Sequence, residues 1–198
     1  MADKTQIANL ALTNLAAENI MDIDEASESA SKIRTVYDHV RNAVFAEHPW
    51  NFCSEDVQLG ALLTKPLNNY TYAYALPTEL VRLNEVYDSH GNRLEPGDYK
   101  VVKDNMLYCN VSPVIINYNI IVEDETKFPP LFVQALAAKL AFEICYSVTG
   151  SRTLQADMWE LYNHKIAMSK NQNAVENNKQ TLKENVEEFG DDWIGARY

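Results

Sequence analysis

The side chains that could act as nucleophiles or metal ligands are few and widely spaced. A zinc site needs such residues in close pairs, and a catalytic thiol needs an imidazole that a third group orients. His48 lies five residues before Cys53, but no orienting group accompanies that pair. We therefore expect buried, unreactive thiols, with neither a metal site nor a cofactor. The complete set of cysteines and histidines is Cys53, Cys109, Cys145, His39, His48, His90 and His164.

Two acidic clusters also lack the spacing that binds a cation. A calcium loop requires oxygen ligands at alternating positions around a central glycine, and neither residues 22–25 nor residues 123–125 have that pattern. The sequence also lacks a glycine-rich phosphate loop, a nucleophile elbow and a His-Glu-x-x-His motif. These features favour a protein that is not an enzyme, and a small thiol or metal hydrolase is the enzymatic alternative.

The C-terminal residues combine acidic groups with large apolar side chains. A disordered acidic tail would be poor in aromatic residues, whereas Trp, Tyr and Arg are frequent anchors of protein interfaces. We predict that residues 181–198 form an interaction arm; the alternative is that Trp193 packs on its own domain. The candidate contact residues of this arm are Phe189, Trp193, Ile194, Arg197 and Tyr198.

Length and composition favour one soluble domain. The chain has 198 residues, of which 46% are hydrophobic, and a formal net charge of −11. A chain of this size buries roughly 70% of the surface that its unfolded form exposes. The negative charge argues against binding of DNA phosphates over the whole surface. We expect a cytoplasmic protein without a membrane span, because the most apolar window, residues 131–148, carries polar side chains at helical spacing.

Apolar periodicity predicts four helices, over residues 3–18, 25–48, 129–149 and 151–178. Asp24 is placed to cap the second helix, Gly150 to end the third, and Ser151 to cap the fourth. After Met168 the fourth helix becomes polar and shows no apolar stripe. Such a helix projects into solvent or packs on another subunit.

Residues 51–122 change to short runs of branched and aromatic residues separated by turn residues, which predicts antiparallel hairpins. The turn from His90 to Asp98 is rich in Gly, Pro and charge, so we expect it to be the best exposed part of this region. Its candidate exposed residues are His90, Asn92, Arg93 and Glu95. The expected fold is α+β: a four-helix bundle with an inserted antiparallel β subdomain (residues 1–180), followed by the arm.

Several local patterns occur in order along residues 5–178. They are an apolar first helix over 7–15, ASESA at 26–30 with IRTVY at 33–37, HPWNF at 48–52, YALPTE at 74–79 with LVRL at 80–83, AAKLA at 137–141 within a helix over 129–150, and a polar fourth helix over 171–177. In these patterns the chain resembles the tail tubular protein A family, the head-to-tail adaptors of short-tailed bacteriophages.

This resemblance implies a structural protein of the virion neck, made in the cytoplasm of the host bacterium. Such adaptors form a homo-oligomeric ring, typically a dodecamer, between the portal protein and the tail nozzle protein. From its own residues we expect the arm to bind the portal or a neighbouring subunit, and the resemblance implies that the His90–Asp98 turn contacts the nozzle. Genomic DNA would pass through the lumen without sequence-specific binding, because an acidic surface repels phosphates. No cofactor and no membrane are implied. The alternative within this class is another head-completion or tail component, such as a stopper or a tail terminator.

Overall fold

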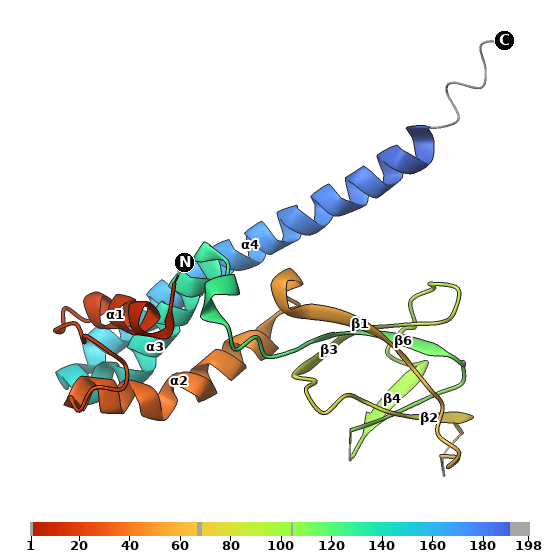
Figure 1. The fold of residues 1–198 in the computed structure, drawn as a ribbon, viewed down its shortest axis with the longest axis horizontal. Coiled ribbons are helices and arrows are strands. Elements are labelled where there is room, and N and C mark those ends of the chain that lie inside the picture. Colours follow the sequence, from red (N-terminus) through yellow and green to blue (C-terminus); the bar gives the residue numbers. More distant parts are fainter. Residues whose placement is uncertain (1, 67–68, 104, 191–198) are drawn as a thin grey trace. The chain divides into compact units, whose positions relative to one another are not determined.

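The computed structural model describes residues 2–66, 69–103 and 105–190, with side chains as far as residue 177 (Figure 1). The chain forms two compact units. Unit 1 contains the residues up to Val40 and from Glu125 onward, and unit 2 contains Arg41–Asp124. Within the described residues, four α-helices and two antiparallel sheets make the fold α+β.

Side-chain caps determine where the first two helices begin. Helix α1 (Lys4–Asn14) starts with a capping box, in which the Asp3 carboxylate accepts from the backbone nitrogen of Gln6 at 2.7 Å. It ends four residues before the predicted position 18, because Ala16 has a left-handed backbone with φ of 52°.

The predicted start of the second helix at residue 25, with Asp24 as its cap, is wrong. Helix α2 (Glu28–Glu47) starts after Ser27, whose Oγ accepts from the backbone nitrogen of Ala30 at 3.2 Å. The preceding residues form a turn in which the Glu25 carboxylate accepts from the backbone nitrogen of Met21 at 2.8 Å. This local hydrogen bond competes with helix formation, so α2 begins about one turn later in the sequence than predicted.

The caps predicted for the last two helices are confirmed. Helix α3 (Pro130–Thr149) ends at Gly150, which has a left-handed φ of 68°. Helix α4 (Arg152–Gly190) follows at once, and the Ser151 hydroxyl accepts from the backbone nitrogen of Leu154 at 3.2 Å. Helix α4 extends 12 residues beyond the predicted end at residue 178.

Helix α3 is the core helix of unit 1 and packs against both α1 and α4. Ten of its residues are buried, whereas Gln134 and Glu143 lie exposed on the predicted polar edge. By length and hydropathy alone this helix could also cross a membrane, a test that the core helices of soluble proteins often pass. The buried side chains account for its apolar sequence without a membrane.

Lys139 holds α4 against α3 through several contacts. Its ammonium nitrogen lies 4.9 Å from the ring centroids of both Phe142 and Trp159. The same nitrogen lies 5.3 Å from the Tyr162 ring centroid and 2.9 Å from the Glu143 carboxylate. The Lys139 side chain is only 17% exposed, so these cation–π contacts are worth about 0.5–2 kcal/mol each.

The described residues of unit 2 form six strands in two three-stranded antiparallel sheets. One sheet has the order β1 (Ser54–Leu59), β6 (Val114–Asn119), β3 (Arg82–Tyr87), and the other has the order β2 (Tyr72–Ala75), β5 (Met106–Cys109), β4 (Tyr99–Val102). Antiparallel pairing is as predicted, but among these strands only β4 and β5 are both consecutive and paired. In β6, four of the six residues are buried, which suits its central position better than an edge. Ser54 is paired with Asn119, so the chain enters and leaves this sheet on adjacent strands.

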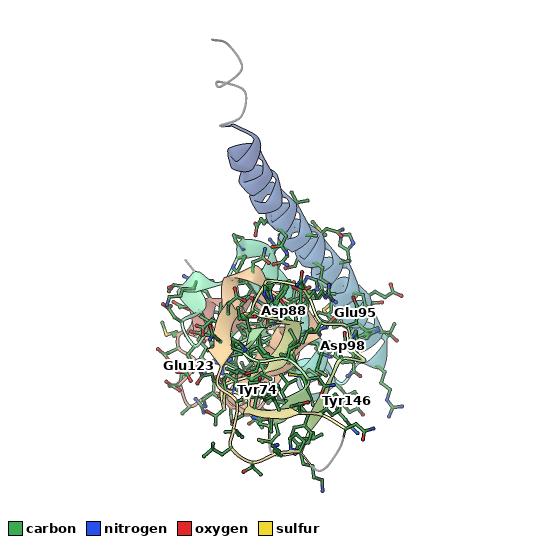
Figure 2. All side chains as sticks on the ribbon, turned by 90° about the vertical axis from the view of Figure 1, so that its right-hand side faces the viewer. Tyr74, Asp88, Glu95, Asp98, Glu123 and Tyr146 are labelled. Carbon is green, nitrogen blue, oxygen red and sulfur yellow. The ribbon has the colours of Figure 1, made fainter. Side chains whose placement is uncertain are left out.

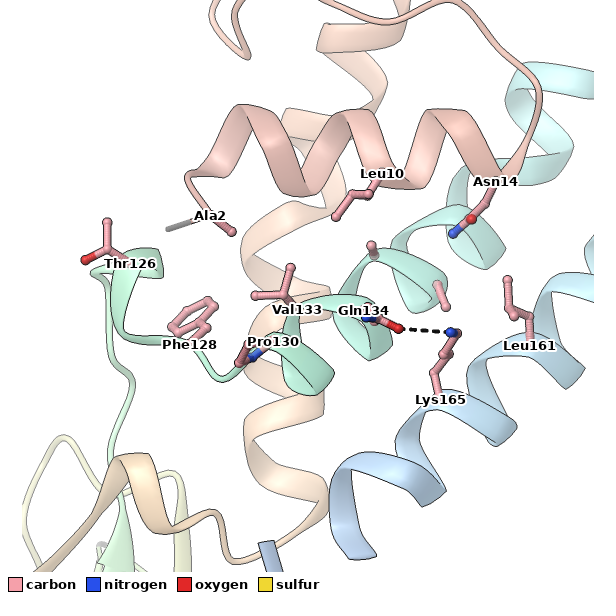
Figure 3. A pocket seen from close by; sticks show the side chains of 12 residues that line it. Ala2, Leu10, Asn14, Thr126, Phe128, Pro130, Val133, Gln134, Leu161 and Lys165 are labelled. Atoms are coloured by element: carbon pink, nitrogen blue, oxygen red, sulfur yellow. Dashed lines mark hydrogen bonds between the residues drawn. The ribbon is translucent and has the colours of Figure 1, made fainter. Parts of the chain in front are cut away.

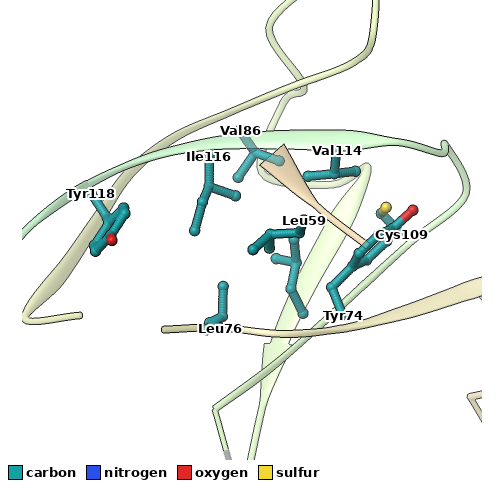
Figure 4. Close-up of a cluster of buried hydrophobic side chains, with 9 residues drawn as sticks. Leu59, Tyr74, Leu76, Val86, Cys109, Val114, Ile116 and Tyr118 are labelled. Atoms are coloured by element: carbon teal, nitrogen blue, oxygen red, sulfur yellow. The ribbon is translucent and has the colours of Figure 1, made fainter. Parts of the chain in front are cut away.

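The two sheets share one apolar core, to which both contribute (Figure 4). Tyr74 is buried in this core, and its hydroxyl donates to the backbone oxygen of Val111 at 2.7 Å, which satisfies the polar group. The buried members of the cluster are Leu59, Tyr74, Leu76, Val86, Leu107, Cys109, Val114, Ile116 and Tyr118.

The last turn of α2 belongs to unit 2 and is capped by side chains of that unit. The final carbonyls of a helix have no partner within the helix. The Trp50 indole nitrogen donates to the Val44 oxygen at 2.9 Å. Arg82 Nη1 donates to the Ala46 oxygen at 2.9 Å. Asn119, which is fully buried, donates through Nδ2 to the oxygens of Phe45 at 3.0 Å and His48 at 2.7 Å.

Replacing Asn119 by alanine should therefore destabilise the protein strongly. Asn119→Ala leaves one buried carbonyl and one half-buried carbonyl without this donor, at a cost of about 2–4 kcal/mol in the free energy of unfolding. Urea denaturation measures the change. The control is Asn163→Ala, an exposed asparagine of α4, which should change stability by no more than about 0.5 kcal/mol. Equal effects of the two substitutions would contradict the capping role.

Candidate interaction surfaces

The turn between β3 and β4, residues 88–98, has its backbone fixed by one carboxylate. Asp88 Oδ1 accepts from the backbone nitrogens of His90 at 2.8 Å and Asn92 at 2.9 Å, and Oδ2 accepts from Asn92 Nδ2 at 2.9 Å. These hydrogen bonds lower the pKa of Asp88, and the bond from the Asn92 side chain is the largest cause. The turn therefore presents its side chains from a backbone that is already ordered.

The four contact residues predicted in this turn are all exposed. Arg93 Nη1 lies 2.9 Å from the Glu85 carboxylate, which also accepts from the Tyr87 hydroxyl. That second hydrogen bond, with burial, raises the pKa of Tyr87 to about 12. At the end of the turn the backbone nitrogen of Glu95 donates to the Asp98 carboxylate at 3.0 Å. Figure 2 shows the two ends of this acidic, exposed turn at Asp88 and Asp98.

The predicted arm lies outside the residues whose side chains are described. Phe189 belongs to the backbone of α4, and Trp193, Ile194, Arg197 and Tyr198 follow its last residue, Gly190. What the structure adds is the element that carries the arm: one helix, continuous from Arg152.

A third surface, which the sequence did not reveal, is a groove between α1, α3 and α4 in unit 1 (Figure 3). Its volume is about 860 Å³, and Leu10, Val133 and Leu161 are among its apolar walls. Lys165 is the one charged side chain among the described residues that line it, and its Nζ donates to Gln134 Oε1 at 2.9 Å. The groove was missed because its walls come from segments far apart in the sequence. In the structure Leu10 marks the groove as an apolar residue that is 43% exposed.

The thiols and imidazoles are not arranged for nucleophilic chemistry. All three cysteines are buried, and burial raises the pKa of Cys53 to about 12 and also raises that of Cys109. A thiol with such a pKa is a poor nucleophile near neutral pH. The His48 ring packs edge-on against Trp50, with 4.8 Å between centroids. In the part of the chain that the structure describes, no group of three or more His, Cys, Asp or Glu side chains could hold a metal ion.

The lowered pKa of Asp88 predicts a pH-dependent stability of the turn. The folded state favours the ionised Asp88 carboxylate. Its contribution to the free energy of unfolding is therefore present above the unfolded pKa of about 3.9, and it is lost as the pH falls through the lower pKa of the folded state. Asp88→Ala should therefore destabilise unit 2 at neutral pH and have a shrinking effect as the medium is acidified below about pH 4. Asn92→Ala removes the side-chain hydrogen bond that is the largest cause of the lowered pKa. It should therefore raise the pKa of Asp88, which carboxyl NMR measures. An Asp88 pKa that does not respond to Asn92→Ala would contradict this account.

Comparison with known proteins adds no assignment: the sequence matches no protein-family model and no curated protein.

Proposed function

We propose that this chain is a structural subunit of a bacteriophage neck, an adaptor that forms a ring between the portal and the tail nozzle. In this proposal the four helices form one bundle, the β unit faces the nozzle, and the C-terminal arm binds the portal or a neighbouring subunit. The ring, of about twelve subunits by resemblance to tail adaptors, surrounds the path of the DNA. In this role the protein connects two parts of the virion and catalyses no reaction.

The observation that carries the proposal is the length to which α4 continues after Asn173, its last buried residue among the described side chains. The inner face of α4 is buried as far as Asn173, and residues 174–177 are all exposed. The helix nevertheless continues to Gly190. A polar helical segment gains little stability in water without packing against something else. An extension of this kind suits a subunit whose partner is another protein.

Two further features support the same proposal. The β unit is inserted between α2 and α3 and carries an ordered, exposed turn, which suits a separate contact surface. The net charge of −11 suits a ring through which DNA must slide, because negative groups repel phosphates.

The direct test is cryo-electron microscopy of the neck of the phage that encodes the chain, with mass spectrometry of purified virions. The proposal requires the chain as a ring in stoichiometric amount directly below the portal. Its position at the tail end of the neck would favour a stopper or a tail terminator. Its absence from virions would refute the proposal.

Deleting residues 182–198 should leave a folded, soluble protein that no longer attaches to DNA-filled, tailless heads. Within the arm, Trp193→Ala should weaken attachment by about 2–4 kcal/mol per site without a large change in melting temperature. The matched control is Trp159→Ala, which removes a ring from the Lys139 cluster and should lower the melting temperature instead. Co-sedimentation with heads and thermal denaturation measure the two effects. A large loss of melting temperature in Trp193→Ala would place Trp193 in the core and contradict its role as an anchor.

Shortening the turn between His90 and Asp98 should leave attachment to heads intact and impair binding of the nozzle protein. The turn is largely exposed, and the shortened variant keeps Leu94, the described residue of the turn that packs against the core of unit 2. Pull-down with purified nozzle protein and co-sedimentation with heads measure the two activities. The reverse pattern, with heads lost and nozzle retained, would show that the β unit faces the portal.

A further inference from the structure

Unit 1 exposes one large apolar side chain almost completely, that of Met21. It is 96% exposed, whereas Ile20 and Ile23 beside it are buried. Among the large apolar side chains that the structure describes, only Leu63 is as exposed. We call residues 20–25, which lie between α1 and α2, the Met21 turn. Because single exposed apolar side chains are common on protein surfaces, the meaning of Met21 depends on how the turn presents it.

The backbone of the Met21 turn is held in place by side chains at both ends. On α1, Asn9 Nδ2 donates to the Ile20 oxygen at 2.9 Å, and Asn9 Oδ1 accepts from the Ile20 nitrogen at 2.9 Å. The Glu25 carboxylate accepts from the backbone nitrogen of Met21 at 2.8 Å. An ordered backbone loses little conformational entropy when its side chain is buried by a partner, so Met21 is presented as a preformed contact.

The Met21 turn is also acidic. Asp22 and Asp24 are exposed, and no cation in the described part of the chain pairs with either carboxylate. Asp22 Oδ1 accepts from the backbone nitrogen of Asp24 at 2.8 Å. Arg34 reaches the turn, but its Nη1 donates to the backbone oxygens of Ile23 at 2.7 Å and Glu25 at 3.0 Å. The turn therefore combines one apolar side chain with two carboxylates that have no ion pair.

The groove between α1, α3 and α4 has the complementary character. Figure 3 shows Leu10 directed from α1 towards α3, and Lys165 reaching from α4 to Gln134. The only partner of the Lys165 ammonium group among the described residues is the neutral Gln134 amide. The groove thus has apolar walls and one cation whose charge is not compensated. It fits an apolar side chain that arrives together with a carboxylate.

Charge distinguishes between the two fully exposed apolar side chains as occupants of the groove. Leu63 is followed by Lys65, and residues 60–66 contain no acidic residue. Insertion of Leu63 would bring the Lys65 and Lys165 ammonium groups together, which like charge disfavours. Insertion of Met21 would instead bring carboxylates to Lys165. Charge complementarity therefore selects the Met21 turn.

The turn and the groove lie on different sides of α1. Thr5 and Asn9 contact the turn, and Thr5 Oγ1 accepts from one of its backbone nitrogens at 3.3 Å. Leu10 and Asn14 line the groove. Each of these residues follows its counterpart by five positions, which is about 140° around a helix. A chain whose Met21 is exposed and held on the first side leaves its own groove open, so the occupant comes from a second molecule.

We propose that a second copy of this chain inserts Met21 into the groove of the first and places the carboxylates of the same turn beside Lys165. Methionine suits such a site, because its flexible, unbranched side chain fills irregular apolar gaps. The two surfaces differ, so the contact is head-to-tail. Each copy offers its turn to one neighbour and its groove to the other, and the arrangement closes into a ring where the rotation between neighbours allows it.

This inference deepens the proposed function and rests on it for the ring, because it names a surface through which the subunits meet. One apolar side chain with its ion pair covers far less than the roughly 800 Å² per partner of a stable interface. The free protein should therefore associate weakly, and salt should weaken the association further. Subunits that are concentrated on a portal would make the contact in full.

The first experiment is sedimentation velocity on the full chain at high protein concentration, at low and at high ionic strength. Wild type should associate at low salt, and Met21→Ser should raise the dissociation constant about tenfold or more. The matched control is Leu63→Ser, which removes an equally exposed apolar side chain and should associate as wild type does. A wild type that is monomeric under all conditions, or equal effects of the two substitutions, would overturn the proposal.

The second experiment tests whether turn and groove meet in different molecules. Met21→Ser keeps an intact groove, whereas Lys165→Glu keeps an intact turn but repels its carboxylates. Each variant alone should associate weakly. An equal mixture of the two should form a dimer and stop there, because only one functional pair of surfaces remains. A mixture that associates no better than its components, with both melting temperatures near that of wild type, would contradict the pairing.

The third experiment tests direction. Leu10→Cys with Met21→Cys in one chain should give, on mild oxidation, a ladder of trimers and larger species. The three native cysteines are buried and should not contribute. The control pair, Leu10→Cys with Leu63→Cys, should give no ladder under the same conditions. Crosslinking of the first pair that stops at the dimer would indicate a two-fold, reciprocal contact and overturn the head-to-tail arrangement.

The failure of this inference and the failure of the proposed function give different results. A ladder from a chain that is absent from virions would refute the proposed function and leave the contact between Met21 and the groove standing. A chain that forms the neck ring in virions but gives no ladder would overturn the contact alone.

Discussion

The fold depends on which groups donate hydrogen bonds to the backbone carbonyls at the C-terminal end of α2. Three of its last carbonyl groups accept hydrogen bonds from Trp50, Arg82 and Asn119, which lie on a loop and two strands of unit 2. Asn119 in turn accepts from Asn84 at 2.8 Å, so the cap continues as a polar contact between β6 and β3. Because a shift of one residue would turn Asn119 to the other face of the sheet, this cap also fixes the register of the central strand.

Unit 1 is organised around a different constraint, the burial of α3. Its apolar side chains require cover from α1 and α4, and the Lys139 cluster fixes α4 against it. Among the side chains that the structure describes, the buried positions of α4 end at Asn173, and residues 174–177 are exposed. The packed part of α4 serves folding, and the proposed function assigns its C-terminal part to a partner.

Local patterns predicted the helices, and the Gly150 and Ser151 caps, because these depend on neighbours within a few residues. The start of α2 was wrong because Glu25 bonds to the turn before the helix, a competition that residue types alone do not rank. Strand partners were only partly predictable, since β6 pairs with strands that lie far from it in the sequence. The groove was not predictable, because Leu10 and Leu161 meet only after folding.

The pairing of Ser54 with Asn119 has an evolutionary consequence. The backbone nitrogen of Ile120 donates to the Cys53 oxygen at 2.9 Å, so the chain leaves the β1–β6 sheet one strand spacing from where it enters. A segment whose two ends are adjacent can be lengthened, shortened or exchanged while the spacing between its flanking helices stays the same. The β unit can therefore vary as one segment. Lineages that share the helical unit can change the strands and turns between residues 54 and 119 without rebuilding the helices.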